Sequence, residues 1–397
     1  MDLFSLIPYD RRSEFLEDLF KAYYACRKNK RNTRDALAFE LNLESNLFEL
    51  FNEIESGTYQ PGPSTAFIVN RPVKREIFAA QFRDRVVHHF VINRLEPILE
   101  ALFLPESFAC RKGKGTNYGI EWIQRSMRES MLNYDSPAYV LKLDISAFFM
   151  SIDRALLELQ LFEIMRSSIP EDELALWVDL VGKIVRRDPT HGCVIRGNSR
   201  RWQDLPSHKS LFHSGRGKGL PIGNLTSQVF ANVFLHQLDT YIRCSLGFEY
   251  YGRYVDDFIL IHTDKAKLIH AVAQIDKYLS DDLMLILHPK KRYLQTIEKG
   301  VPFLGAVIYP DRLRMGDRLK NQFISSLCHP YDVHKVNQFQ SRLNSYLGAI
   351  SKYPTYAFRT RQLTRRLDKR WFRHGQLNSE MTVFQLVSNA GRRSPLV

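Results

Sequence analysis

The stretch GRYVDDFILIH (residues 252–262) places two adjacent aspartates, Asp256 and Asp257, between two runs of strand-forming residues. Adjacent carboxylates repel each other, and aspartate is a poor strand residue. The pattern therefore predicts a hairpin whose turn holds both aspartates. Two explanations fit such a turn: the ordinary preference of aspartate for turns, or a cation that the two carboxylates face.

A third aspartate, Asp144, lies near the end of a predicted strand in AYVLKLDISAFF (138–149). Strand alternation puts Val140, Lys142 and Asp144 on one face of that strand. If three carboxylates from different strands meet at one sheet edge, their mutual repulsion and burial cost free energy unless divalent cations neutralise them. Two oxygen-liganded Mg²⁺ ions at such an edge activate a hydroxyl and stabilise a departing pyrophosphate in phosphoryl transfer. Taken alone, these residues leave the plain turn and the plain strand end open.

The composition of the 397-residue chain favours a polyanionic partner. Its 56 Lys and Arg residues exceed its 43 Asp and Glu residues, which gives a net charge of +13, and basic surfaces concentrate phosphate groups. The five cysteines lie far apart without a CxxC pair, so neither a zinc site nor a disulfide framework is expected. The sequence has no apolar run of bilayer length and no apolar signal core at its N-terminus. We expect a reduced, cytoplasmic, soluble protein without a membrane role.

Hydrophobic periodicity and turn residues predict an α+β core followed by a mainly helical C-terminal module. A hairpin with a basic turn is expected in FIVNRPVKREIF (67–78), and the span 186–218 is strongly basic and interrupted by glycine and proline. A helix over 86–103 is expected to be bent or interrupted by Pro97. Further helices are expected over residues 13–56, from about 118, and over 153–186, 228–242, 265–282 and 359–373.

Seven short segments carry a resemblance to one enzyme family. YVDD (254–257) resembles the YxDD box of reverse transcriptases, and LKLDISAFF (141–149) resembles their first aspartate motif. The other segments that resemble motifs of this family are FRDRVVHH (82–89), ESFACRKGKG (106–115), GLPIGNLTSQVFANVFL (219–235), LHPKKRYL (287–294) and VPFLGAVI (301–308). Because all seven occur in the family's order, the resemblance is specific and favours a metal site over a plain turn.

The resemblance implies a right-hand polymerase fold of the α+β class, with an antiparallel palm sheet. It also implies an RNA-directed DNA polymerase that uses template RNA, deoxynucleotides and two Mg²⁺ ions, with Mn²⁺ as a substitute. The implied parts are an N-terminal helical extension (1–57), fingers (58–137), a palm (138–310) with an insertion at about 186–218, and a mainly helical thumb with a basic C-terminus (311–397).

The resemblance also implies roles for single residues at the reaction centre. Asp144 and Asp256 resemble the two bridging metal ligands, and Asp257 resembles the third carboxylate. Ile145 would lend a backbone carbonyl to the metal site and border the nucleotide. Lys291 fits the lysine near the leaving pyrophosphate, although position does not distinguish it from its neighbour, Lys290.

For the incoming nucleotide, Arg75 matches the arginine that covers the triphosphate, with Arg71 or Lys74 as a second charge. Phe149, five residues after Asp144, matches the position at which a ring blocks a 2′-hydroxyl; packing in the core is the alternative for this side chain. The residues expected at the template and primer are Tyr254, Ser227 and Gln228, with Phe303, Leu304 and Gly305 in the primer-grip hairpin.

The segment 219–235 resembles the family's loop and helix that position the incoming nucleotide, and its sequence points to one subfamily. Most reverse transcriptases carry Gln–Gly there, whereas this chain has Ile222 and Gly223 in LPIGNLTSQ (220–228), a pattern typical of diversity-generating retroelements. An apolar side chain in place of the amide removes one oriented hydrogen bond, which weakens discrimination by about 1–2 kcal/mol, or roughly tenfold. The alternative is that Ile222 is a neutral packing variant.

This subfamily resemblance implies error at template adenines, complementary DNA (cDNA) that diversifies a target gene, and a small basic pentameric accessory protein as partner. Phage-defence, retron-like and CRISPR-associated reverse transcriptases are the alternatives, together with a non-polymerising RNA-binding scaffold. Nucleic-acid contacts are expected on 186–218 and 359–373, where Trp202, Phe212, Trp371 and Phe372 lie among basic residues. For 359–373 the alternative is a helix whose Leu363, Leu367 and Trp371 pack inward.

Overall fold

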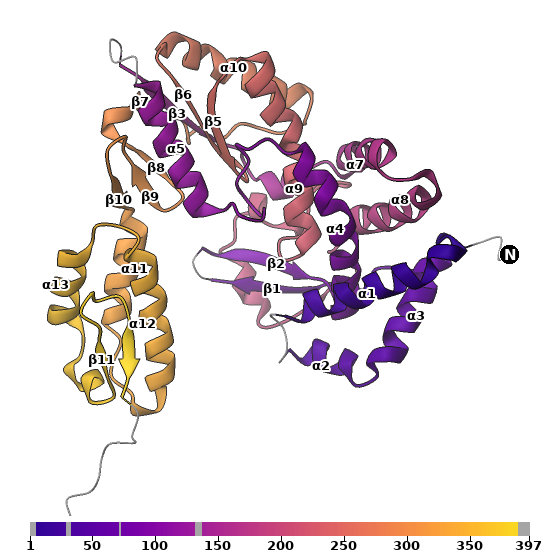
Figure 1. Ribbon diagram of the computed structural model, residues 1–397, viewed down its shortest axis with the longest axis horizontal. Helices are drawn as coiled ribbons and strands as arrows, with labels where there is room; N and C mark the ends of the chain where they lie inside the picture. The colour runs from indigo at the N-terminus through magenta and orange to yellow at the C-terminus, as the bar shows by residue number, and fades with distance from the viewer. Residues whose placement is uncertain (1–4, 29–32, 71–72, 132–136, 388–397) are drawn as a thin grey trace, which may run out of the picture. The chain divides into compact units, whose positions relative to one another are not determined.

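The computed structural model describes residues 5–28, 33–70, 73–131 and 137–387 (Figure 1). The chain forms two compact units: residues 1–119 with 141–294, and residues 120–140 with 295–397. The expected α+β architecture with antiparallel sheets is confirmed. The expected boundaries of extension, fingers, palm and thumb stay a prediction. No helix in the described ranges is both long and apolar enough to cross a membrane.

The first unit begins with helices. The helical pattern of residues 13–56 is confirmed by α1 (Arg12–Arg27), α2 (Arg34–Glu40) and α3 (Leu43–Glu55). Helix α4 (Phe82–Leu102) contains Pro97, so the expectation of an interruption there is wrong. The buried side chains of Leu95 and Leu99 flank the proline and anchor both halves of the helix in the core, and tertiary packing outweighs the loss of one backbone hydrogen bond.

A second group of elements forms the hairpin expected over residues 67–78, which we call the fingers hairpin after the family resemblance. Strands β1 (Thr65–Val69) and β2 (Arg75–Ala79) pair antiparallel, and the short β4 (Val194–Ile195) pairs parallel with β1. The basic span 186–218 is thereby attached to the edge of this hairpin. It continues through 3-10 turns at Ser199–Trp202, Ser207–Lys209 and Leu211–His213.

A four-stranded sheet contains Asp144 and Asp257, with strand order β5-β6-β3-β7. Its strands are β3 (Tyr139–Asp144), β5 (Tyr250–Tyr254), β6 (Asp257–His262) and β7 (Tyr293–Thr296). Strands β5 and β6 form the predicted hairpin, with Tyr254 opposite Asp257. Residues 258–261 are all buried, so β6 is covered on both faces, and helix α10 (Lys265–Asp281) packs on it.

The remaining helices of this part of the chain lie between residues 116 and 245. They are α5 (Thr116–Ser130), α6 (Phe148–Ser151), α7 (Arg154–Ser168), α8 (Glu171–Arg186) and α9 (Leu225–Thr240), which continues into a π-helical turn at Tyr241–Ser245. Helix α9 begins directly after the loop that carries Ile222 and Gly223, so the loop motif ends in a buried helix.

The second unit contains a small sheet of β8 (Val301–Phe303), β9 (Ala306–Ile308) and β10 (Leu313–Met315). It also contains α11 (Asp317–Leu327), α12 (Val336–Ile350), α13 (Tyr356–Arg366) and the hairpin of β11 (Gly375–Leu377) and β12 (Phe384–Leu386).

The helix expected over 359–373 ends at Arg366, so that expectation is wrong in its second half. Leu367 is extended, and the Asp368 side chain caps a new 3-10 turn by accepting from the Arg370 amide. Trp371 is 1% exposed and stacks on Phe339 with ring centroids 3.9 Å apart. It is therefore a core residue, and the expectation that it stacks on nucleic acid is wrong.

Candidate active site

The turn between β5 and β6 consists of Val255 and Asp256, because Tyr254 and Asp257 pair across it. Val255 has φ +57°. In two-residue hairpin turns a positive φ at this first position is typical of glycine, and a β-branched residue there is an outlier. Such strain costs about 1–3 kcal/mol and persists only where the surroundings hold the backbone.

Asp144 ends β3, the strand next to β6, and the following residue contacts the turn directly. The Ile145 amide donates to the Asp256 carbonyl at 3.1 Å. Burial, and after it the charge of Asp144, raises the pKa of Asp256 to about 6. Burial also raises the pKa of Asp257, against the opposing effect of Lys142. The structure therefore brings Asp144 near enough to both turn carboxylates to act on their ionisation.

Two lysines contact these carboxylates. The Lys291 ammonium lies 2.9 Å from both carboxylate oxygens of Asp144, and Lys142 lies 2.9 Å from Asp257 Oδ2. Lys142 and Asp144 thus share a strand face, as alternation predicts. The backbone amide of Lys290 donates to His288 Nδ1. Of the two neighbouring lysines, Lys291 is therefore the one whose side chain contacts Asp144.

A divalent cation fits the chemistry of this donor set, which consists of carboxylate oxygens. Asp257 Oδ1 is buried and finds no hydrogen-bond partner among the described residues, and burial, which raises the pKa of Asp256, disfavours its charged form. A bound cation would relieve both. In the described ranges, however, no three His, Cys, Asp or Glu side chains are grouped closely enough to hold a metal ion. The ligand roles expected for Asp144, Ile145, Asp256 and Asp257 stay predictions.

The nucleotide-positioning loop is attached to the fingers hairpin by its backbone. The Phe78 amide donates to the Ile222 carbonyl at 3.0 Å, and the Ala80 amide donates to Asn224 Oδ1 at 3.1 Å. Gly223 has φ +129°, and a Cβ there would lie 2.8 Å from the Ile77 side chain. Glycine is therefore required at this position, and the Ile222 side chain is left half-exposed beside the hairpin.

Of the two adjacent phenylalanines, Phe148 is buried and Phe149 is half-buried, with ring centroids 5.4 Å apart. Phe148 therefore fills the core position. The carbonyl of Phe149 accepts from the Leu220 amide at 2.7 Å, which holds the predicted sugar gate against the nucleotide-positioning loop. The gate role itself stays a prediction.

The predicted triphosphate residues that the structure describes lie at the turn end of the fingers hairpin, where Arg75 pairs with Val69. Arg75 is exposed at the first position of β2. Lys74 lies 3.6 Å from Asp204 of the basic span. Arg71 falls outside the described residues.

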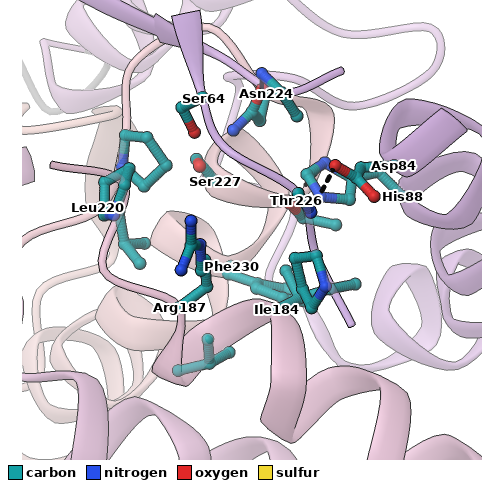
Figure 2. Close-up of a pocket in the computed structure, with 16 residues that line it drawn as sticks. Ser64, Asp84, His88, Ile184, Arg187, Leu220, Asn224, Thr226, Ser227 and Phe230 are labelled. Atoms are coloured by element: carbon teal, nitrogen blue, oxygen red, sulfur yellow. Dashed lines mark hydrogen bonds between the residues drawn. The ribbon is translucent and has the colours of Figure 1, made fainter. Parts of the chain in front are cut away.

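A small cavity of about 30 Å³ lies beneath the nucleotide-positioning loop (Figure 2). This volume suits about one water molecule and no nucleotide. Ser227 lines the cavity and is buried, whereas Gln228 is exposed, so of these two predicted template contacts only Gln228 lies at the surface. Asp84 accepts from the Tyr59 hydroxyl at 3.0 Å, and burial raises the pKa of Asp84.

The predicted primer and template residues fall in both units. In the first unit, Tyr254 is half-buried beside the turn. In the second unit, Phe303 is buried in its own sheet, and Leu304 and Gly305 form the two-residue turn between β8 and β9, with φ +52° and +86°. Their contacts with nucleic acid stay predictions.

The basic span packs on the fingers hairpin through Glu76, a contact that the sequence did not predict. The buried Glu76 carboxylate accepts from the Trp202 indole at 2.7 Å, from the Ser210 hydroxyl at 2.8 Å and from the Leu211 amide at 2.6 Å. Trp202 is therefore held against the fingers hairpin and stays partly exposed, and its stacking on bases stays a prediction. Phe212 remains partly exposed, with its ring 5.3 Å from that of Phe78.

Sequence reasoning also missed a fully buried ion pair behind the turn. Arg253 in β5 and Asp239 in α9 are both 0% exposed, with 2.6 Å between Nε and Oδ1. The available signal was an arginine inside a strand that is otherwise apolar or aromatic. A buried guanidinium requires an acidic partner, but the identity of that partner depends on the tertiary fold.

Known proteins resemble this chain in sequence. A family profile described as "Reverse transcriptase (RNA-dependent DNA polymerase)" matches residues 73–308, more than half of the chain. Protein YkfC of Escherichia coli (strain K12) is 22% identical over 323 residues, which cover 73% of this chain and 76% of YkfC. The group II intron-encoded protein LtrA of Lactococcus lactis subsp. cremoris is 20% identical over 260 residues, which cover 64% of this chain and 38% of LtrA.

Among solved structures, telomerase from Candida tropicalis in complex with a TWJ fragment of telomeric RNA aligns with a TM-score of 0.49 at 14% identity. The alignment covers 76% of this chain and 55% of the telomerase chain. The chain thus spans about half the length of that telomerase and less than half the length of LtrA.

Proposed function

Because the chain belongs to the reverse transcriptase family of RNA-dependent DNA polymerases, we propose that it copies a template-repeat RNA into error-prone, adenine-mutagenised cDNA for the diversification of a target gene. The observation that carries the polymerase assignment is the approach of Asp144 to the Asp256–Asp257 turn. The observation that carries the error-prone assignment is Ile222 in the nucleotide-positioning loop. The partners of this reaction are template RNA, deoxynucleotides and the small basic pentameric accessory protein, in the cytoplasm.

In the proposed chemistry, Asp144, Asp256 and Asp257, with the Ile145 carbonyl, would hold two Mg²⁺ ions, for which Mn²⁺ substitutes. When bound, such ions activate the primer 3′-hydroxyl and stabilise the departing pyrophosphate. Lys291 supplies a positive charge at Asp144, next to the same centre, and positive charge favours a developing pyrophosphate.

The residues around the nucleotide then select and orient it. Arg75, with Lys74 or Arg71, neutralises the triphosphate. The half-exposed ring of Phe149 excludes a 2′-hydroxyl by steric clash, which favours deoxynucleotides. These roles are supported by two backbone hydrogen bonds: the Leu220 amide donates to the Phe149 carbonyl, and the Phe78 amide of β2 donates to the Ile222 carbonyl of the same loop.

The Ile222 backbone supports the error-prone assignment. Its carbonyl is held by the Phe78 amide, so the loop is fixed while the side chain presents only apolar atoms. The site therefore offers no side-chain hydrogen bond at this position to distinguish a correct base pair from a misaligned one. One such bond is worth about 1–2 kcal/mol, or roughly tenfold in discrimination.

The test is primer extension on an adenine-containing RNA, with Mg²⁺, deoxynucleotides and the accessory protein supplied, followed by sequencing of the product. We expect extension with substitutions concentrated opposite adenine, and a roughly tenfold lower error rate for Ile222→Gln and Ile222→Asn. Extension with errors spread evenly over all four template bases would reject the diversity-generating role and favour a phage-defence, retron-like or CRISPR-associated enzyme. Unchanged error spectra in both variants would remove the assignment of fidelity to Ile222.

A further inference from the structure

The Arg253–Asp239 ion pair satisfies every donor of a fully buried guanidinium. Arg253 Nε and Nη2 each lie 2.6 Å from one oxygen of Asp239, which is a bidentate pair. The other donors reach Ser107 Oγ at 3.2 Å, Asn232 Oδ1 at 3.3 Å and the Val255 carbonyl at 3.0 Å. Arginine has five N–H donors in a fixed fork, and all five are used here.

A buried ion pair of this kind is a poor source of stability, because desolvation of the two charges offsets most of their attraction. The bond to Val255 indicates a different purpose. The Val255 carbonyl belongs to the central peptide of the strained turn, and the next carbonyl, that of Asp256, accepts from the Ile145 amide. The turn is therefore held at two consecutive carbonyls, by its own strand through Arg253 and by β3 through Ile145.

Asp239 links this arrangement to the rest of the site. It lies in the last turn of α9, the helix that begins at the nucleotide-positioning loop, and it also accepts from the Tyr251 hydroxyl at 2.7 Å. On the other side, residues 106–108 pair with β5, because the Arg253 amide donates to the Glu106 carbonyl and the Phe108 amide donates to the Arg253 carbonyl. Arg253 thus joins three parts of the chain: its guanidinium binds Asp239 of α9 and the turn, and its backbone pairs with residues 106–108.

We propose that Arg253, aligned by Asp239, is a positioning residue that holds the Val255–Asp256 peptide in its strained orientation and so aims the Asp256 carboxylate at Asp144. This inference rests on the proposed polymerase function, since that function is what requires a defined direction of Asp256. Lysine cannot replace arginine here, because its single ammonium cannot bridge Asp239 and the Val255 carbonyl in one fork.

The test uses a second-site variant that removes the need for the hydrogen bonds of Arg253 and Asp239 at the turn, which we call the clamp. Glycine adopts a positive φ without strain, so Val255→Gly should make the turn independent of Arg253. We expect Arg253→Lys to lower kcat about tenfold or more, with little change in the KM for deoxynucleotide, because misplacement of a reacting group affects mainly the chemical step. In the Val255→Gly background, the same Arg253→Lys change should cost about threefold or less.

Two readouts are independent of DNA synthesis. Mn²⁺ binding followed by electron paramagnetic resonance should weaken in Arg253→Lys, and hydrogen exchange should accelerate in residues 250–262. Arg243→Lys is the matched control, since Arg243 forms an ion pair with the buried Glu106 at 2.9 Å and donates to the Phe248 and Glu249 carbonyls, away from the turn. It should leave kcat and Mn²⁺ binding at wild-type values.

Asp239→Asn provides a second route should Arg253→Lys fail to fold, because it keeps an acceptor for the guanidinium while it removes the charge that aligns it. It should show the same loss of kcat and the same relief by Val255→Gly. Wild-type kcat and Mn²⁺ binding in the folded clamp variants, or equal losses whether or not the Val255→Gly change is present, would overturn the proposal. If the wild-type protein does not extend a primer, the polymerase function is rejected instead. The role of Arg253 and Asp239 would then still be tested by comparing Mn²⁺ binding and hydrogen exchange between the wild type and the variants.

Discussion

Replacement of Asp256 by asparagine should stabilise the protein when divalent cations are absent. Burial and Asp144 raise the pKa of Asp256 from 3.8 to about 6 in the folded state. The folded state therefore binds a proton more tightly than the unfolded state, and this contribution to stability is present below about pH 4 and lost as the pH rises to about 6. Above that pH, the folded wild type carries the full cost of a charged Asp256, whereas the asparagine variant carries none.

The size of the effect follows from the pKa difference. A shift of about two pH units corresponds to about 3 kcal/mol. Because Asp256 is half-buried rather than enclosed, solvent screening should reduce this to about 1–2 kcal/mol. For a protein of this size we expect the melting temperature of Asp256→Asn to exceed that of wild type by about 1–3 °C at pH 8. At pH 5 the linkage relation leaves about half of that difference.

The assay is thermal denaturation in EDTA at pH 8 and pH 5, repeated with Mg²⁺ and Mn²⁺. Added divalent cations should stabilise the wild type more than Asp256→Asn, so the difference should shrink or reverse. Asp276→Asn is the control, since Asp276 is 46% exposed in a surface ion pair with Arg292 and its loss should change stability by less than about 1 kcal/mol. No gain at pH 8, or an equal gain at both pH values, would refute the reasoning.

Three further predictions concern the residues around the turn and the basic span. Phe149→Val should raise ribonucleotide incorporation relative to deoxynucleotide about tenfold or more in kcat/KM; an unchanged ratio would assign Phe149 to packing. Lys291→Met should lower kcat by roughly tenfold to a hundredfold in single-nucleotide incorporation, whereas Lys290→Met should not; the reverse ranking would exchange their roles. Glu76→Gln should destabilise the basic span by about 2 kcal/mol, because the glutamine amide cannot accept all three hydrogen bonds. Proteolysis within 186–218 should then accelerate, and an unchanged cleavage rate would contradict the inference that Glu76 holds this span on the hairpin.

The sequence predicts those parts of the fold that depend on local patterns, such as strand alternation and runs of strand-forming residues. Alternation placed Lys142 and Asp144 on one strand face, and the strand-forming runs around Asp256 and Asp257 predicted the hairpin that joins β5 to β6. The motif order then indicated which segments meet. That order predicts that Asp144 approaches the turn, and in the structure the amide of the next residue, Ile145, donates to the Asp256 carbonyl.

The parts that the sequence did not predict depend on contacts between distant segments. Trp202 lies among basic residues, and nothing in that segment shows that its indole donates to the Glu76 carboxylate on β2, 126 positions earlier. The helix expected to Arg373 breaks because Asp368 caps a new turn. Arg253 gave a signal of buried charge, yet nothing local identifies its partner on α9. Propensity describes a segment, whereas these features depend on which other segment it meets.

The central claim is that the three aspartates of one site polymerise deoxynucleotides on an RNA template. The most direct measurement is primer extension by the wild type and by the double variant Asp256→Ala/Asp257→Ala, with RNA binding measured on the same preparations. The account predicts that the double variant binds RNA as the wild type does and extends no primer. Extension that survives the loss of both carboxylates, or a wild type that binds RNA but never extends a primer with Mg²⁺ and the accessory protein present, would contradict it.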